Sequence, residues 1–187
     1  MALSSRVREE VRRCRPDFWY FCRRHIRVPD REEMTGPAIP LVANDAQRET
    51  VEAIRRHQKV YILKCRRRGI STIVLAYNLW RALYVENFKA LIVSESDEGA
   101  KTMMRIVLAM YDGLPPYLRR KATEKTKRRL MFSHGGGIYG YSQKARSFRG
   151  DGVVAIHLTE FALYDDFDDV FAKALNMTGG TYEVVLE

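Results

Sequence analysis

The sequence has few cysteines, few prolines and no long hydrophobic run. Its 187 residues include three cysteines, Cys14, Cys22 and Cys65, and six prolines. Three widely spaced cysteines form neither a disulfide framework nor a structural zinc site, so we expect a reducing intracellular compartment. No apolar run approaches the roughly 20 residues that span a membrane, and the arginine-laced N-terminus lacks the apolar core of a signal peptide. We therefore expect no membrane partner. A hydrophobic content of 46% is typical of a globular protein.

Acidic residues are scarce over much of the chain. There are 32 Lys and Arg against 23 Asp and Glu, which gives a formal net charge of +9. Residues 113–150 contain ten basic residues and one acidic residue, whereas residues 151–187 contain eight acidic residues and the single basic Lys173. Such a charge points to a polyanionic partner, but it does not distinguish DNA, RNA, nucleotide or acidic lipid. Each single charge fits a solvated loop or helix face equally well.

The pattern of apolar residues predicts an α/β fold. Helices are expected over residues 5–27 (two short helices divided by Pro16), 45–57, 71–85, 97–111 and 165–176. Strands are expected over residues 59–64, 89–94, 153–158 and 182–186. The segment His134-Gly135-Gly136 lies between two further runs, 129–133 and 137–142, and predicts a β-hairpin. Alternation of strands and helices favours a sheet of parallel strands with right-handed crossovers.

A basic, glycine-containing segment joins a predicted strand to a predicted helix. It runs from Lys64 to Thr72 with the sequence KCRRRGIST. In the phosphate loop Gly-x-x-x-x-Gly-Lys-Ser/Thr, backbone N–H groups bind phosphate oxygens, the Lys neutralises charge and the hydroxyl holds Mg²⁺. Here Lys64 stands at the first Gly position and Ile70 at the Lys position, while Gly69 and Ser71 fit the pattern. The positive charge would come instead from Lys64 and Arg66–Arg68. A basic loop that touches nucleic acid is the open alternative.

An acidic residue follows the predicted strand 153–158. A phosphate-loop ATPase needs a carboxylate at the end of a neighbouring strand to orient Mg²⁺ and polarise the attacking water. Glu160 stands at that place, and Thr159 precedes it where an Asp is usual. The simpler interpretation of a single Glu is a solvated strand end. The distance of Glu160 downstream of the loop favours a catalytic role instead.

Taken in order, these motifs resemble the ATPase domain of the large terminase subunit of tailed bacteriophages, the motor that packages double-stranded DNA into procapsids. The resemblance covers essentially the whole chain and departs from the family pattern at Arg68 and Thr159. The residues that carry it are Asp17-Phe18-Trp19-Tyr20-Phe21, Gln47-Arg48, Lys64 to Thr72, Arg149-Gly150 and Leu158-Thr159-Glu160-Phe161-Ala162.

The resemblance implies a fold and a cellular setting. It implies a phosphate-loop NTPase of the additional-strand, catalytic-glutamate type, with a mostly parallel sheet flanked by helices and an added β-hairpin. Residues 1–40 would form a helical segment packed on the ATPase core of residues 41–187. The core would be truncated at its C-terminus and lack the nuclease domain, so no DNA cleavage is expected from this chain. The implied partners are double-stranded DNA, the portal protein, the small terminase subunit and further copies in a ring on the procapsid, the isolated domain being monomeric. The setting is the host cytoplasm, without retention in the virion.

The resemblance also assigns roles to residues, with ATP and Mg²⁺ as cofactors. Gln47 would recognise adenine, Ser71 would ligate Mg²⁺, and Glu160 would activate water and meet Mg²⁺ through water. Arg149, or Arg146 in its place, would complete the site of a neighbouring subunit. The implied nucleotide-binding residues are Gln47, Lys64, Arg66, Arg67, Arg68, Gly69, Ile70, Ser71 and Thr72.

Two other functions remain open from the sequence. One is a helicase-like ATPase that depends on nucleic acid and acts outside packaging. The other is a non-catalytic basic module that binds DNA and carries a degenerate, inert phosphate loop.

Overall fold

The apolar strand segments assemble into one seven-stranded sheet. A computed structural model describes residues 4–28, 38–63, 68–150 and 152–187 of the chain. The strands of the sheet are β3 (Lys59–Tyr61), β4 (Lys89–Ser94), β5 (Ala122–Lys125), β6 (Arg129–Phe132), β7 (Gly137–Ser142), β8 (Val153–Leu158) and β9 (Thr178–Leu186). They lie in the order β3-β9-β8-β4-β7-β6-β5. The expected α/β class with a mostly parallel sheet is confirmed.

Five strands run parallel and two run antiparallel. The first five strands in the order, β3, β9, β8, β4 and β7, are parallel neighbours. The predicted hairpin is confirmed, because β6 pairs antiparallel with β7, with Leu130 opposite Ile138. Strand β5 pairs antiparallel with β6 at the edge and was not predicted. Its sequence, ATEK, carries two charges and no apolar run, as edge strands often do.

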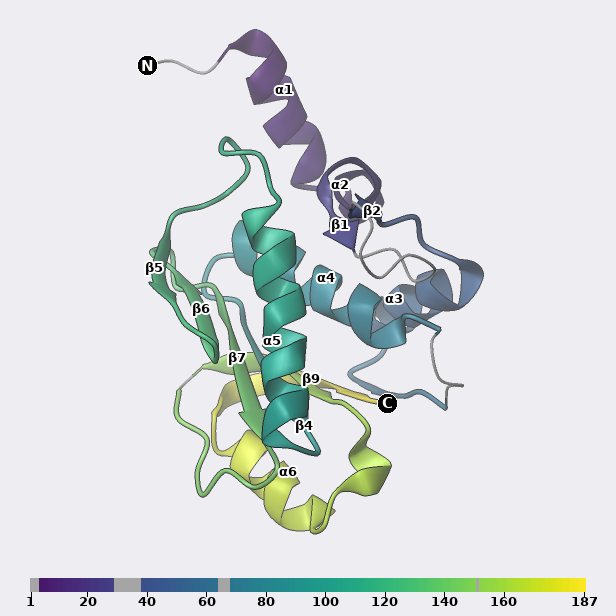
Figure 1. Cartoon of the computed structure of the whole chain (residues 1–187), viewed down its shortest axis with the longest axis vertical. Coiled ribbons are helices and arrows are strands. Elements are labelled where there is room, and N and C mark those ends of the chain that lie inside the picture. The colour runs from purple at the N-terminus through teal and green to yellow at the C-terminus, as the bar shows by residue number, and fades with distance from the viewer. Residues whose placement is uncertain (1–3, 29–37, 64–67, 151) are drawn as a thin grey trace.

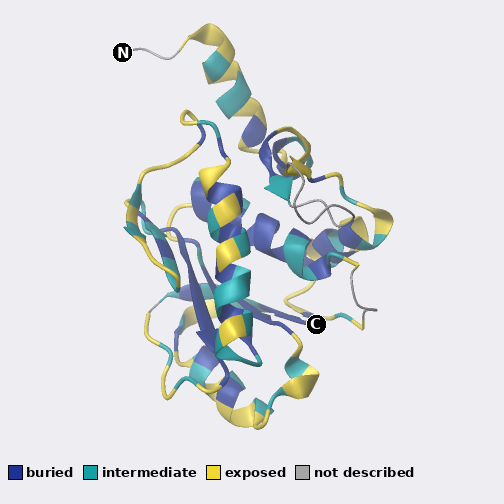
Figure 2. Ribbon diagram, in the orientation of Figure 1, coloured by how far each residue is buried: buried dark blue, intermediate teal, exposed yellow. Residues whose placement is uncertain are grey.

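Helices cover both faces of the sheet (Figure 1). Alternate residues of a strand point to opposite faces, and in β4 the side chains of Ala90 and Ile92 join one core cluster while Leu91 and Val93 join the other. The first cluster contains residues of α3 (Asp45–Arg56), α4 (Ile70–Tyr84) and α5 (Asp97–Asp112). The second contains residues of α6 (Phe167–Leu175), which therefore covers the other face. Figure 2 shows the central strands buried between these layers.

Two short helices precede the core, with Pro16 between them as predicted. They are α1 (Ser5–Cys14) and α2 (Phe18–His25), capped by the side chains of Ser4 and Asp17. Phe18 is fully buried, and its ring centroid lies 5.0 Å from that of Tyr77 on α4. The indole Nε1 of Trp80, also on α4, donates to the carbonyl of Cys14 at 2.9 Å. A two-stranded ladder of β1 (Arg27–Val28) and β2 (Ile39–Pro40) follows, which was not predicted.

The predicted bounds of the long elements agree closely with the structure. The helix expected over 71–85 is α4, the helix expected over 97–111 is α5, and the strand expected over 89–94 is β4. The strand expected over 59–64 is described only as Lys59–Tyr61, and Lys64 lies outside the described residues. Within the described part of the chain, no helix combines the length and the apolar character that crossing a membrane requires.

Candidate active site

A cavity of about 680 Å³ opens at the carboxyl ends of the parallel strands β3, β9 and β8. Parallel strands end at one edge of a sheet, so the segments that follow them meet there. Three segments supply most of the polar side chains: the start of α4, the turn after β8 and the end of β9. The lining residues are Tyr61, Ile62, Leu63, Arg68, Gly69, Ser71, Thr72, Met103, Ile106, Glu160, Phe161, Ala162, Leu163 and Glu187.

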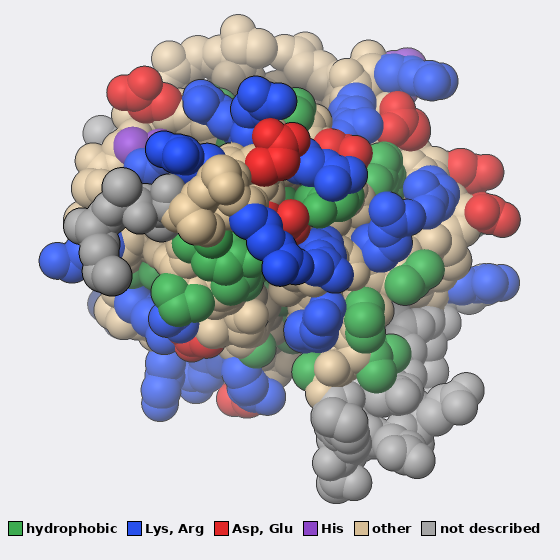
Figure 3. Space-filling view, turned by 90° about the horizontal axis from the view of Figure 1, so that it is seen from above, with side chains coloured by type: hydrophobic (Ala, Val, Ile, Leu, Met, Phe, Trp, Pro, Cys, Tyr) green, Lys and Arg blue, Asp and Glu red, His purple; other side chains and the backbone are tan. Residues whose placement is uncertain are grey.

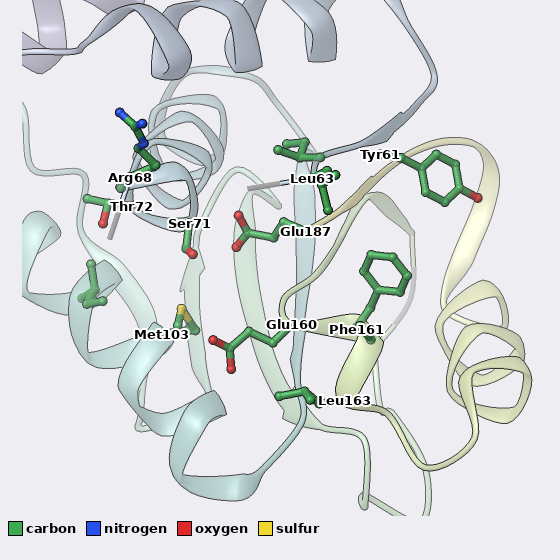
Figure 4. A pocket seen from close by; sticks show the side chains of 14 residues that line it. Tyr61, Leu63, Arg68, Ser71, Thr72, Met103, Glu160, Phe161, Leu163 and Glu187 are labelled. Atoms are coloured by element: carbon green, nitrogen blue, oxygen red, sulfur yellow. The ribbon is translucent and has the colours of Figure 1, made fainter. Parts of the chain in front are cut away.

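The N-terminus of α4 faces this cavity. Gly69 is its N-cap residue and adopts the left-handed conformation, with φ 72° and ψ 22°, which glycine tolerates without strain. As a glycine, Gly69 has no side chain to cap the helix, and the first N–H groups of a helix have no partner within the helix. Together with the helix dipole they favour an anion at this end. The hydroxyl side chains of Ser71 and Thr72 line the same opening (Figure 4).

The predicted loop residues have different surroundings in the structure. Arg68 lines the cavity. Ile70, at the usual Lys position, is only 3% exposed and belongs to the core, so only its backbone is available to a ligand. Lys64, Arg66 and Arg67 lie outside the described residues.

Gln47 does not line the cavity. It is 5% exposed, and its side-chain oxygen accepts from the Asn44 N–H at 3.1 Å in the capping box of α3. Its side-chain Nε2 donates to the carbonyl of Gly69 at 2.8 Å. Both polar ends of the side chain are thus used within the protein, and they tie α3 to the end of the loop. Recognition of adenine by Gln47 remains a prediction, and it would require the amide to exchange these partners.

Glu160 projects from the turn after β8 into the cavity (Figure 4). Its backbone is left-handed, with φ 53° and ψ 37°, and it caps the short 3₁₀ helix η1 (Phe161–Leu163). Residues other than glycine rarely adopt this conformation, which is enriched at functional sites. The preceding Thr159 is 1% exposed, and its N–H donates to the Val93 carbonyl at 2.9 Å. The turn is therefore held by its neighbour strand while Glu160 stays exposed.

Sequence reasoning missed a second carboxylate of this site, Glu187. Its Oε1 atom lies 3.0 Å from Nε2 of His157 on β8, and both residues are buried. Burial, followed by the negative charges of Glu95, Glu187 and Glu160, raises the pKa of the Tyr164 phenol. Acidic groups are thus concentrated at this edge of the sheet. The only signal in the sequence was that Glu187 directly follows an apolar strand.

Arg149 and Arg146 do not line the cavity of their own chain. Both are exposed. The backbone N–H of Arg149 donates to the Tyr141 hydroxyl at 3.2 Å, and that hydroxyl donates to the Arg149 carbonyl at 3.0 Å. The segment is therefore fixed by its backbone while its side chains face outward. A role in a neighbouring subunit remains a prediction.

A separate group of possible metal ligands lies between α1 and α2. One ligand atom each from Glu10, Cys14 and His25 lies within 4.8 Å of the others. The Glu10 carboxylate already accepts from the Tyr20 hydroxyl at 2.9 Å and lies 2.7 Å from His25 Nε2. Burial raises the pKa of the Cys14 thiol to about 12, which disfavours the thiolate that binds metals. Hydrogen bonding explains this cluster without an ion.

Comparison with known proteins identifies the fold. No family model and no curated protein sequence matches the chain. Among solved structures, the large terminase of bacteriophage HK97 superimposes with a TM-score of 0.72 at 17% identity, over 91% of this chain and 36% of that one. A mutant of the ATPase domain of the Thermus phage P74-26 large terminase gives 0.51 at 14% identity, over 79% and 70%.

The fold is that of phage large terminases. The resemblance expected from the motifs is thereby confirmed at the level of the fold, although identities of 14–17% are too low to carry residue roles across. The chain spans 36% of the length of the HK97 large terminase. In this large-terminase fold, the cavity described above lies at the carboxyl edge of the sheet, where α/β proteins bind their ligands.

Proposed function

We propose that this chain is the ATPase domain of a large-terminase motor, which couples ATP hydrolysis to movement of double-stranded DNA into a procapsid. One observation carries the proposal: a single cavity joins the N-terminus of α4, which begins after Gly69, to the carboxylate of Glu160. An anion-binding helix end and a base opposite it are the two parts that phosphoryl transfer to water requires.

The residues around the cavity fit a magnesium nucleotide. The N–H groups at the start of α4 would hold phosphate oxygens, with Arg68, and by the sequence pattern Lys64, Arg66 and Arg67, supplying positive charge. The Ser71 hydroxyl and the carboxylates are hard oxygen ligands, which Mg²⁺ prefers. When bound, Mg²⁺ neutralises charge on the phosphates and orients them. Glu160 would take the proton of the attacking water, and its strained backbone would hold the carboxylate toward the phosphates.

The charge of the remaining surface supports DNA as the translocated partner. Figure 3 shows Lys and Arg side chains spread over the face seen from the α1 end of the molecule. Exposed arginines on α1 and the basic stretch 113–150 provide charges that lie away from the cavity. Basic side chains that neutralise DNA phosphates give binding that does not depend on sequence, as a packaging motor needs. In this proposal the portal protein, the small terminase subunit and further copies of the chain are its partners in the host cytoplasm.

The test is to separate nucleotide binding from hydrolysis. Glu160→Gln should still bind ATP in calorimetry and lose hydrolysis by roughly 10²–10⁴-fold, the range found when a general base is removed. Ser71→Ala should weaken magnesium-dependent ATP binding. Glu98→Gln, which removes an exposed carboxylate of α5 outside the cavity, is the matched control and should change neither quantity. The proposal would be rejected if Glu160→Gln hydrolysed ATP at the rate of the unmodified chain, or if the unmodified chain did not bind ATP.

A further inference from the structure

Beside Glu160 lies a carboxylate that the sequence motifs do not assign. We propose that Glu187 supplies the second carboxylate toward the divalent cation of the nucleotide, in place of the aspartate that Thr159 replaces, and that His157 holds Glu187 in position. This inference rests on the proposed ATPase function and adds a residue to its site.

The register of the sheet places Glu187 beside Thr159. Strands β8 and β9 are parallel neighbours in which Leu158 is the partner of Leu186. The next residue of each strand is Thr159 and Glu187, and the Glu187 N–H donates to the Leu158 carbonyl at 3.1 Å. The two residues therefore stand at the same level of the carboxyl edge, one strand apart. A carboxylate missing after β8 is present after β9.

Thr159 itself does not reach the cavity. It is 1% exposed and does not line the opening. Within the described residues its Oγ1 atom is buried and has no hydrogen-bond partner. Glu187 does line the opening, and its carboxylate points to the same side as that of Glu160, toward the start of α4 with Ser71 (Figure 4). The polar group available at this level of the sheet is thus that of Glu187, directly after β9.

His157 explains why the Glu187 carboxylate stays in one orientation. It lies on β8, two residues before Thr159. The His157 and Glu187 side chains are 1% and 0% exposed, with 3.0 Å between Nε2 and Oε1. A buried carboxylate is costly unless it is paired and hydrogen-bonded. The Glu187 carbonyl also accepts from the Phe161 N–H at 3.2 Å, which links this residue to the turn that carries Glu160.

The charges of the cavity require a cation between these carboxylates and a triphosphate. Glu160 and Glu187 both line the space that the phosphates would enter. Two carboxylates repel each other and repel an anionic ligand, and a cation between them reverses both effects. Carboxylates and a hydroxyl are the donor set that suits Mg²⁺ or Mn²⁺. A second carboxylate at the cavity therefore strengthens binding of ATP together with the metal ion and weakens binding of ATP alone.

The experiment measures metal binding rather than activity. In the 187-residue chain, the affinity of the protein–ATP complex for Mn²⁺ is measured by the loss of the free-ion signal in electron paramagnetic resonance. ATP affinity is measured by calorimetry with Mg²⁺ and with EDTA. The variants are Glu187→Gln, which removes the charge, and Glu187→Asp, which keeps the charge on a shorter side chain. Glu183→Gln is the control, because Glu183 is a carboxylate of β9 whose side chain is 18% exposed and pairs with Arg81 away from the cavity.

Glu187→Gln should lower Mn²⁺ affinity by roughly 10–100-fold, the range for groups that orient a bound metal, while ATP binding in EDTA is kept or becomes tighter. Glu183→Gln should match the unmodified chain. If Glu187→Gln binds Mn²⁺ with unchanged affinity, the inference is overturned. The proposed function would still stand in that case, provided that the unmodified chain binds ATP. No ATP binding by the unmodified chain would overturn the proposed function itself and the inference with it. If circular dichroism shows that Glu187→Gln does not fold, Glu187→Asp keeps the charge and should lose about tenfold; no loss there overturns the inference.

Discussion

At the scale of single residues, Gln47 shows how one side chain fits two different roles. The resemblance assigns it to adenine, whereas in the structure its amide closes the capping box of α3 and donates to the Gly69 carbonyl. The second arrangement fixes the residue that begins α4, so Gln47 positions the anion-binding helix end. If Gln47 positions the helix end, it affects the binding of phosphates, which all nucleotides share. If it recognises the base, it affects the binding of adenine nucleotides alone.

This difference can be measured with two nucleotides. Gln47→Ala leaves the Gly69 carbonyl and the Asn44 N–H without these partners, so we expect the free energy of unfolding to fall by about 1–3 kcal/mol. ATP and GTP affinity, measured by calorimetry, should fall by the same factor. Gln58→Ala removes an exposed glutamine just beyond α3 and should change none of these quantities. A loss confined to ATP would support adenine recognition instead.

At the scale of elements, the junction of α1 and α2 is held by a polar network that responds to pH. Burial lowers the pKa of His25, with Arg24 and Arg27 acting in the same direction against Glu10. Burial raises the pKa of Glu10, but hydrogen bonds from His25 and Tyr20 outweigh it, and the net pKa is lowered. Both groups therefore bind protons more weakly in the folded chain than in the unfolded one.

Acidification should loosen this junction. Since the unfolded state takes up more protons, the contribution of His25 to stability is complete above its unfolded pKa of about 6.5 and is lost as the pH falls below it. We expect urea unfolding to show a lower stability at pH 5 than at pH 7.5. In His25→Gln the difference between the two pH values should shrink. An equal difference in both proteins would mean that other groups cause the pH dependence.

Elements with a local signal were predictable, and contacts between distant segments were not. Strand β4 and helix α5 follow from short apolar runs and helical spacing, and their bounds agree with the structure. Strand β5 was missed because it has no apolar run, and it forms only by pairing with β6. In the candidate site, Ser71 and Glu160 followed from motifs. The pair His157 and Glu187 is 30 residues apart and depends on the register of β8 and β9, which no local pattern encodes.

At the scale of the whole molecule, the basic segment that follows β7 lies outside the cavity. The segment carries Arg146 and Arg149, both exposed and neither lining the cavity of its own chain. An arginine placed in this way can reach a phosphate only on another molecule. If copies of the chain form a ring, the neighbour's nucleotide is one such phosphate, and an arginine there would stabilise the charge of the transition state. DNA is the other.

Mixing two inactive variants separates these two partners of Arg149. Arg149→Ala lacks the arginine but keeps Glu160, and Glu160→Gln lacks the base but keeps the arginine. If Arg149 acts across a subunit interface, the mixture contains interfaces with both groups intact. Hydrolysis should then return to roughly a quarter of the unmodified rate when equal amounts of the two variants pair at random. ATP hydrolysis is measured at concentrations where sedimentation shows association, and the same mixture with Arg146→Ala in place of Arg149→Ala tests the alternative arginine. No recovery in the Arg149→Ala mixture, together with weaker DNA binding and a shallower salt dependence of Arg149→Ala alone, would instead assign this arginine to DNA phosphates.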